Sequence, residues 1–587
     1  MILISILFYF TFPPSIQIDP FITKSVSQTG SADILCLLKS PYTDLGSITR
    51  DFDSKDQMGE YVFTHLKSYA DQSQQHIIRQ LSHDQVSYRS FYIVNAIHIP
   101  HATRAVIDYL IARPEVDHLE FNSNYTRLKP IEENNQALIP LESRSPQAIE
   151  WGILRIKADS LWALGIKGKG AVIGGEDTGV DLVADIKKSY RGSQSDGSVN
   201  NNFNWHDAIH KLNPLNRDTT QNPKNNPCGL DTIGPCDDDN HGTHTMGTMA
   251  ATDMQIGIAP EAKWIACRCM ERGWGGLASY IECFQFFLAP TDLKNQNPDP
   301  KKAPHVINNS WGCPTEEGCN PNNFGTMEQV VKNLKAAGIF VTVSAGNSGG
   351  LGCSSINDIP AIFEASFSVG ATTNAKDTIA GFSSLGPVAI DNTLRKKPNI
   401  SAPGVGVLST IKGGGFTRLS GTSMSGPHVS GAIALLISAF PQLAGKVDLL
   451  ENILEQSAEP KIIMSLCGAD ALNAIPNNVF GYGRLDVYKA YQLARQLSAT
   501  PTADHNTLRT LKVFPNPSDQ VIWFDLGPRE VASKIAVFNI QGQSVLQKKV
   551  NQSLFYIDIT SLPVGMYYYS VQSTLHNYYS GKIVVKH

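Results

Sequence analysis

Ser423, His241 and Asp177 lie far apart in the chain, each in a short segment rich in glycine and threonine. A serine hydroxyl is a weak nucleophile until a neighbouring base removes its proton. Histidine, with an ordinary pKa of about 6.5, is the usual base, and a carboxylate can orient its ring. These three residue types therefore allow nucleophilic catalysis if the fold brings them together.

Taken alone, each of these residues has a simpler explanation. Asp177 lies in an Asp-Thr-Gly segment, which is typical of a turn whose aspartate caps the following amides. His241 and His244 have the spacing of two metal ligands on one helix face, but the sequence offers no intervening glutamate and no third ligand. Ser423 in its glycine-rich segment is equally compatible with a helix cap. Only the combination favours catalysis.

The segments around these residues are expected to place them at one edge of a sheet. The apolar residues 171–175 predict a buried strand just before Asp177, and sites in open α/β sheets usually form at the carboxyl ends of strands. His241 begins a helix-like segment. An apolar run at 432–440 follows Ser423 and predicts a buried helix whose positive end holds the serine, with Pro427 in the first turn.

Together, the order Asp, His, Ser and the segments around each residue resemble the subtilisin-like serine proteases, or subtilases. Residues 258–260, 263–268 and 306–312 are most similar to the bacillopeptidase F-like branch of that family. The resemblance implies that Ser423 attacks the scissile carbonyl, His241 acts as general base and acid, and Asp177 orients the imidazole. It leaves His244 and His428 as packed or hydrogen-bonded residues.

The resemblance also assigns the groups that would surround the substrate. Asn347 follows an apolar strand and matches the family's oxyanion asparagine, with the backbone N–H of Ser423 as the second donor; as an isolated Gly-Asn pair it would be a turn. An extended substrate is expected to add a strand between residues 272–276 and 310–312. The expected substrate-binding residues are Gly273, Gly275, Ser310, Trp311, Gly312 and Gly346. Trp311 has core packing as its alternative.

No metal-binding residue is assigned, and no cofactor is required for the chemistry that the family implies. The family makes a structural Ca²⁺ ion an option, at a place that the sequence does not locate. Three consecutive aspartates at 237–239 precede His241, where they can attract basic substrate residues, bind Ca²⁺ or form a solvated loop. With no other ligands evident in the sequence, the solvated loop is favoured.

Composition limits the class of protein. The chain has 587 residues, enough for several domains, and its 49 Lys+Arg against 53 Asp+Glu give a formal net charge of −4. This balance offers no attraction for nucleic acid. With 42% hydrophobic and 17% charged residues, the chain fits neither a disordered nor a fibrous protein. The N-terminal apolar run, residues 2–12, is too short for a membrane span, and no other apolar stretch is long enough.

The N-terminal part divides into two expected segments. Residues 1–19 contain an apolar run broken by two prolines and read as a signal peptide, although the absence of Lys and Arg before it leaves a buried strand as the alternative. Residues 20–146 mix strands (33–38, 90–99, 118–121) with polar helices (57–81, 102–112), as in a small α+β domain. Their position resembles that of a subtilase propeptide, which inhibits its own protease and is removed near the polar segment 132–147.

Residues 147–496 alternate strand-like and helix-like segments, which predicts an α/β fold, here a subtilisin-like parallel sheet with helices on both faces. A linker at 497–508 leads to short alternating strands at 509–587, typical of a β-sandwich. In residues 513–517 (Val-Phe-Pro-Asn-Pro), 565–567 (Gly-Met-Tyr) and a final strand with Lys582, this last domain resembles the sorting domain of the type IX secretion system. A carbohydrate-binding or adhesin sandwich is the alternative.

The ten cysteines are too few for a disulfide scaffold. Two close pairs in loop-like segments, Cys228 with Cys236 and Cys313 with Cys319, are expected to form disulfides in an oxidising compartment. Cys267 and Cys269 alternate around Arg268 and are expected in a buried strand rather than at a metal.

The sequence therefore predicts a serine endopeptidase, secreted or attached to the bacterial cell surface, that is made as a self-processed zymogen. Its partners would be protein or peptide substrates, its own propeptide, and the outer-membrane secretion machinery. The alternative is an inert surface-binding protein on a subtilase scaffold. The presence of all three residues of the triad argues against that alternative.

Overall fold

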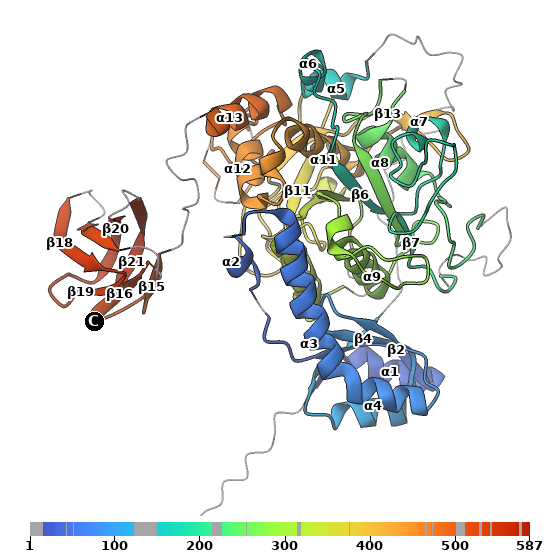
Figure 1. Ribbon diagram of the computed structural model, residues 1–587, viewed down its shortest axis with the longest axis horizontal. Coiled ribbons are helices and arrows are strands. Elements are labelled where there is room, and N and C mark those ends of the chain that lie inside the picture. Colours follow the sequence, from blue (N-terminus) through green and yellow to red (C-terminus); the bar gives the residue numbers. More distant parts are fainter. Residues whose placement is uncertain are drawn as a thin grey trace, which may run out of the picture. The chain divides into compact units, whose positions relative to one another are not determined.

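The computed structural model describes residues 16–499 and 511–586, apart from 43, 51, 123–148, 214–215, 217–225, 254, 314–318, 375, 464–466, 469, 472, 527–530, 540–542 and 574–577. The chain forms two compact units, Met1–Leu497 and Ser498–His587 (Figure 1). The expected signal peptide falls largely on residues outside the described part. The whole of the expected cleavage segment, 132–147, falls outside it too, as do residues 500–508 of the expected linker.

The larger unit is built on a seven-stranded sheet in the order β12-β11-β10-β9-β6-β8-β7, with every neighbouring pair parallel. Its strands are β6 (Val172–Asp177), β7 (Trp205–Asp207), β8 (Lys263–Arg268), β9 (Val306–Asn309), β10 (Phe340–Ser344), β11 (Phe367–Thr372) and β12 (Ile400–Pro403). These strands are almost wholly buried, as parallel sheets covered on both faces are.

Helices cover both faces of this sheet. Successive residues of β6 point to opposite layers: a Cβ on Gly175 would lie 2.6 Å from Met246 of α8, and one on Gly174 would lie 2.9 Å from Phe287 of α9. α8 (His241–Ala250) and α11 (Thr422–Ala439) form one layer, and α9 (Leu277–Leu288) and α10 (Phe324–Ala336) belong to the other. The expected α/β fold is thereby confirmed.

The remaining elements of this part of the chain are short or peripheral. Helices α5 (Trp151–Arg155), α6 (Ala158–Ala163) and α7 (Ala184–Lys187) precede α8, and α12 (Val447–Ser457) and α13 (Val487–Ala499) follow α11. The hairpin β13 (Val407–Thr410) and β14 (Phe416–Leu419) comes directly before α11.

A small α+β module precedes this fold within the same unit. Its sheet has the order β1-β5-β2-β4-β3, with β1 (Gln17–Ile18), β2 (Ser31–Leu38), β3 (Arg89–Phe91), β4 (Ala96–Thr103) and β5 (Val116–Phe121). Its helices are α1 (Pro20–Thr29), α2 (Gly46–Thr49), α3 (Lys55–His83) and α4 (Arg104–Ile111). Because β1 pairs with β5, the module's sheet begins at Gln17, before the expected boundary at residue 20.

The expected single strand at 90–99 is wrong. Residues between Phe91 and Ala96 form a turn in which Asn95 has φ +48°, and the chain reverses there so that β3 and β4 pair antiparallel. The run is mostly apolar because the turn itself is buried, including Ile93. Asn95 interrupts it, and asparagine tolerates the left-handed conformation of a turn, but the apolar residues on both sides obscure this break.

The C-terminal unit contains two antiparallel sheets around one apolar core. The first has the order β15-β16-β19 and the second β18-β17-β20-β21. Their strands are β15 (Lys512–Phe514), β16 (Val521–Asp525), β17 (Ala532–Phe538), β18 (Ser544–Gln552), β19 (Leu554–Asp558), β20 (Gly565–Ser573) and β21 (Tyr578–Val585). The expected sandwich is confirmed. Its edge strand β18 buries no residue and so lacks the alternation that marks a half-buried strand.

Four disulfides tie the larger unit together. Both expected pairs, Cys228–Cys236 and Cys313–Cys319, are present. Cys267–Cys283 joins β8 to α9, and Cys353–Cys467 joins segments that are 114 residues apart. Cys267 does lie in a buried strand, but its disulfide was not expected, because the sequence does not show that α9 crosses beside β8.

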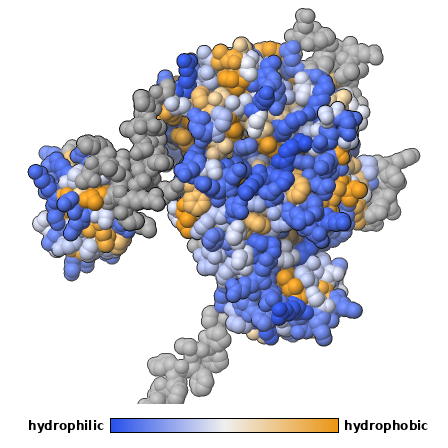
Figure 2. Space-filling model, in the orientation of Figure 1, coloured by the Kyte–Doolittle hydropathy of each residue, from blue (hydrophilic) through white to orange (hydrophobic). Residues whose placement is uncertain are grey.

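Large apolar side chains lie mostly in these cores. On the face in Figure 2, hydrophilic residues dominate and hydrophobic ones form scattered patches. In the described part of the chain, no helix combines the length and apolar character needed to cross a bilayer.

Candidate active site

Parallel strands bring their carboxyl ends to one edge of the sheet, and the expected site residues gather there. Asp177 ends β6, and His241 is the first residue of α8. The imidazole Nδ1 donates to Asp177 Oδ1 over 2.7 Å, and both side chains are buried. Because Nδ1 carries this proton, Nε2 is the nitrogen that can accept another. Sixty-four residues apart in sequence, the two side chains form an oriented base.

A second carboxylate fixes the start of α8. The first amides of a helix lack partners within it. Asp237 supplies a partner for one of them: it accepts hydrogen bonds from the amide and the hydroxyl of Thr243, the third residue of α8. It also accepts from the amides of Asp239 and Asn240, just before the helix. Burial raises the pKa of Asp237, and these hydrogen bonds oppose that rise. His241 therefore begins a helix whose first turn is hydrogen-bonded to Asp237.

The residue after Asp177 joins the same structure. The Thr178 hydroxyl donates to Asp237 Oδ1 over 2.9 Å and accepts from the amide of Gly242 over 3.0 Å. The end of β6 and the beginning of α8 are thus bonded directly to each other. The expectation of a solvated loop at 237–239 is wrong for Asp237 and Asp238, which are only 2% and 5% exposed.

Ser423 is the second residue of α11 and is 1% exposed. Its hydroxyl donates to the carbonyl of Ser310, just beyond β9, over 3.1 Å. The Ser310 hydroxyl in turn donates to the carbonyl of Ser423 over 2.9 Å. Two hydrogen bonds therefore tie the expected nucleophile to the end of a neighbouring strand.

Pro427 makes this exchange available. It lies inside α11 rather than in the first turn, because the helix begins at Thr422. Proline has no N–H, so it cannot donate to the carbonyl four residues earlier, which is that of Ser423. That carbonyl is left to accept from Ser310.

Asn347 follows β10 and lies against the start of α11. Its Oδ1 accepts from both the amide and the hydroxyl of Thr422, each over 2.9 Å. Its Nδ2 is buried and has no hydrogen-bond partner among the residues that the structure describes. A Cβ built on Gly421 would lie 3.5 Å from this Nδ2 and 3.6 Å from the amide nitrogen of Ser423. Two donors therefore flank one point, as the binding of an oxyanion requires.

The other two histidines near the site make only structural contacts. His244 Nε2 lies 3.1 Å and 3.2 Å from the carbonyls of Val407 and Thr417. His428 Nδ1 lies 2.9 Å from the carbonyl of Met424. Burial lowers the pKa of His244 to about 3 and that of His428 to about 4, so both are neutral at pH 7.

The residues expected to bind substrate include three glycines at which a side chain would be strained or would clash. Gly273 and Gly346 have φ of +84° and +102°, so their backbones need glycine. At Gly275 a Cβ would lie 2.3 Å from the Tyr280 hydroxyl. Ser310 exchanges two hydrogen bonds with Ser423. The expected residues Trp311 and Gly312 follow it directly in the chain.

Trp311 does not line a pocket with its side chain. It is 2% exposed and stacks on Tyr280 of α9, with ring centroids 3.8 Å apart and an interplanar angle of 4°. Its ring is part of the core between the sheet and α9, which was the alternative that the sequence left open. Only its backbone remains available to a substrate.

Within the described ranges, no group of three or more His, Cys, Asp or Glu side chains is arranged to hold a metal ion. The structure therefore names no residues for the Ca²⁺ ion that the family resemblance leaves as an option.

Comparisons with known proteins match two separate parts of the chain. Residues 168–483 match the model of the subtilase family, and residues 512–586 match that of a secretion system C-terminal sorting domain. Bacillopeptidase F of Bacillus subtilis is 34% identical over 449 residues, which are 73% of this chain and 28% of that protein. Subtilisin DY of Bacillus licheniformis is 30% identical over 302 residues, or 51% of this chain and 88% of that protein. The chain thus spans little more than a quarter of its bacillopeptidase relative.

Proposed function

The chain belongs to the subtilase family, and we propose that it is a serine endopeptidase that hydrolyses peptide bonds in extended polypeptides. The observation that carries the proposal is the buried 2.7 Å hydrogen bond between His241 Nδ1 and Asp177 Oδ1, at the sheet edge where α11 presents Ser423. A carboxylate, an imidazole and a hydroxyl at one edge are the groups that acyl transfer needs.

In the proposed reaction, Ser423 Oγ attacks the scissile carbonyl carbon and passes its proton to His241 Nε2. Asp177 stabilises the imidazolium that forms. The carbonyl oxygen becomes an oxyanion, which accepts from the Ser423 amide and Asn347 Nδ2. The imidazolium then protonates the leaving amine as the C–N bond breaks, and water, deprotonated by the same histidine, hydrolyses the acyl-enzyme.

The substrate would bind as an extended strand beside residues 272–276 and 310–312. Main-chain hydrogen bonds of this kind tolerate many sequences. We call residues 272–276 the substrate strip. Gly275 supports this proposal, because its surroundings leave no space for a side chain there.

We also propose that the N-terminal module inhibits the enzyme until it is cleaved away near 132–147. The module's last described residue, Asn122, accepts through Oδ1 from the amide of Ala278 over 2.9 Å. Ala278 lies only two residues beyond the 272–276 strip, so the chain leaves the module beside the proposed substrate site.

The C-terminal sorting domain indicates an extracellular or cell-surface protein. Recognition of this domain by the outer-membrane secretion machinery, and attachment to the cell surface, belong to the proposal.

The test is covalent labelling of the full chain with a fluorophosphonate, together with hydrolysis of a peptide library. We expect labelling at Ser423 and hydrolysis, both lost in Ser423→Ala. Ser430→Ala, on the same helix, is the matched control and should retain both. In Ser423→Ala the N-terminal module should also stay attached.

Two results would contradict the proposal. A folded wild-type chain that neither labels nor hydrolyses would favour an inert binding protein on this scaffold. Cleavage at 132–147 that continued in purified Ser423→Ala would refute self-processing.

A further inference from the structure

A fully buried arginine lies beside the site and is not needed for the proposed chemistry. Arg268 ends β8, and its Cα is the register partner of Asp177 on the adjacent strand. Its side chain has no exposed surface. Placing a guanidinium in the interior is costly unless charged and hydrogen-bonding partners surround it. Its partners therefore indicate what it holds in place.

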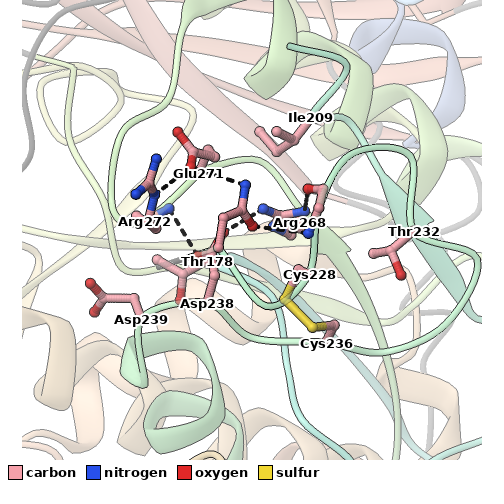
Figure 3. Close-up of polar contacts among 12 residues, drawn as sticks. Thr178, Ile209, Cys228, Thr232, Cys236, Asp238, Asp239, Arg268, Glu271 and Arg272 are labelled. Atoms are coloured by element: carbon pink, nitrogen blue, oxygen red, sulfur yellow. Dashed lines mark hydrogen bonds and ion pairs between the residues drawn. A yellow bond between two sulfur atoms is a disulfide. The ribbon is translucent and has the colours of Figure 1, made fainter. Parts of the chain in front are cut away.

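Arg268 joins three separate segments. Nη1 donates to Asp207 Oδ2 over 3.1 Å, at the end of β7, and to the carbonyl of Gly229 over 3.0 Å. Nη2 donates to Asp238 Oδ2. Figure 3 shows Arg268 and Asp238, with the Cys228–Cys236 disulfide beside them. Two buried carboxylates thus share one guanidinium.

Asp238 connects this arginine to both parts of the proposed active site. It lies between Asp237, which holds the start of α8, and the two residues that lead to His241. Its Oδ1 accepts from the amide of Arg272 over 2.9 Å. Arg272 has φ +50°, a conformation that non-glycine residues seldom adopt, and it begins the 272–276 strip. The Asp238 carboxylate therefore links the loop that leads into His241 to the 272–276 strip.

The Cys228–Cys236 disulfide encloses the third segment that Arg268 contacts. Cys228 and Cys236 enclose the loop that supplies the Gly229 carbonyl. The carbonyl oxygen of Cys236 packs so closely on Gly179 that a Cβ there would lie 1.9 Å away. Gly179 is two residues beyond Asp177, so the loop that surrounds Arg268 also presses on the end of β6.

We propose that Arg268, acting through Asp238, is a positioning residue that keeps His241 and the 272–276 strip in a fixed relation to each other. This inference rests on the proposed function. A displacement of about 1 Å in reacting groups can cost on the order of a hundredfold in rate. A clamp on both the base and the substrate strip would act on that alignment.

Two variants and a matched control test the clamp. Arg268→Lys keeps the charge but loses the planar fork that reaches Asp207, Gly229 and Asp238 together. Asp238→Asn keeps the shape and an oxygen for Arg272, so it decides the question even where Arg268→Lys does not fold. Arg191→Lys is the control. Arg191 also donates to several groups, Asn204 and the Lys302 carbonyl among them, and none of its hydrogen-bond partners among the described residues lies at 237–241 or 272–276.

The measurements are KM and kcat, with kcat normalised to the number of sites titrated by fluorophosphonate. They use an extended peptide and a small ester that does not reach the strip. We expect kcat to fall on the order of tenfold to a hundredfold in both variants. KM should rise for the peptide but not for the ester. The double variant should be no worse than the more severe single one, since the two residues act as a unit.

Wild-type kcat and KM per titrated site in both variants, with only a lower unfolding temperature, would overturn the inference and leave the proposed function intact. An equal loss in Arg191→Lys would also overturn it. A wild-type chain that neither labels nor hydrolyses would overturn the proposed function and this inference with it.

Discussion

At the scale of single residues, the site contains polar groups that have no partner within their own helix or strand. Pro427 lacks an N–H, and the carbonyl of Ser423 is therefore left to Ser310. Asn347 uses its oxygen on Thr422, and its Nδ2 stays open beside the Ser423 amide. A group without an internal partner is costly when buried, so such groups suggest a role in binding.

Asn347→Asp separates the two ends of that side chain. The carboxylate keeps the acceptor for Thr422 but replaces the Nδ2 donor with an oxygen. We expect kcat to fall about 100- to 1,000-fold, as when one oxyanion donor is removed elsewhere, with little change in KM. The measurement is steady-state hydrolysis per titrated site. An unchanged kcat would show that Asn347 does not contact the oxyanion.

Glu176 predicts a pH dependence of stability. It is completely buried, and neither carboxylate oxygen has a hydrogen-bond partner among the described residues. Burial, and secondly the charge of Asp177, raise the pKa of Glu176 well above its ordinary value. The folded chain therefore keeps this proton after the unfolded chain has lost it. Stability falls as pH rises above the ordinary value of about 4.3, by about 1.4 kcal/mol per unit, until the folded pKa is reached.

Glu176→Gln removes this titration while keeping the shape. In the Ser423→Ala background, which prevents autolysis, we expect the glutamine variant to resist urea better than its parent at pH 8 and about equally at pH 4. The exposed Glu261→Gln is the control. A difference that did not shrink on acidification would contradict the account.

At the scale of elements, two disulfides join residues in the loops between strands and helices. Cys353–Cys467 closes a far longer stretch of chain than Cys313–Cys319, with sequence separations of 114 and 6. A crosslink restricts the unfolded chain more when it closes a longer loop.

Replacing both cysteines of a pair by serine should therefore cost different amounts. Chain entropy gives about 5 kcal/mol for Cys353→Ser/Cys467→Ser and about 2 kcal/mol for Cys313→Ser/Cys319→Ser. Urea unfolding in the Ser423→Ala background measures both. Equal losses would indicate that the native contacts of each site, rather than loop length, set its contribution.

At the scale of the whole molecule, the N-terminal module shares a core with the subtilase fold. One continuous apolar cluster includes Leu66 and Tyr92 of the module and Phe284 and Val330 of α9 and α10. Polar contacts surround it, including an ion pair of 3.2 Å between Arg89 and Glu282. The module is therefore packed as part of one unit and is not merely tethered.

Gln285 offers a way to weaken this interface alone. Its Oε1 accepts from the amides of Tyr92 and Ile93, over 2.7 Å and 3.2 Å. Gln285→Met leaves both amides without that acceptor, at a cost of about 1 to 3 kcal/mol, so a cleaved module should bind about 5- to 150-fold more weakly.

A foreign protease site inserted at 132–146 of Ser423→Ala allows this measurement. After cleavage, gel filtration over a dilution series gives the affinity of the module for the remainder. The exposed Gln194→Ala is the control. Equal affinities for Gln285→Met and its parent would show that these hydrogen bonds do not hold the module.

The sequence alone determined the order of the parts, the α/β alternation and the residues proposed for catalysis, because these are recorded in local spacing. Only the tertiary structure decided that Trp311 packs in the core, that Asp237 and Asp238 are buried, and that Arg268 lies between Asp207 and Asp238. The Cys353–Cys467 bond and the docking of the module against α9 were decided in the same way. These contacts join residues far apart in the chain, and their energies depend on burial and distance, which periodicity along a sequence does not record.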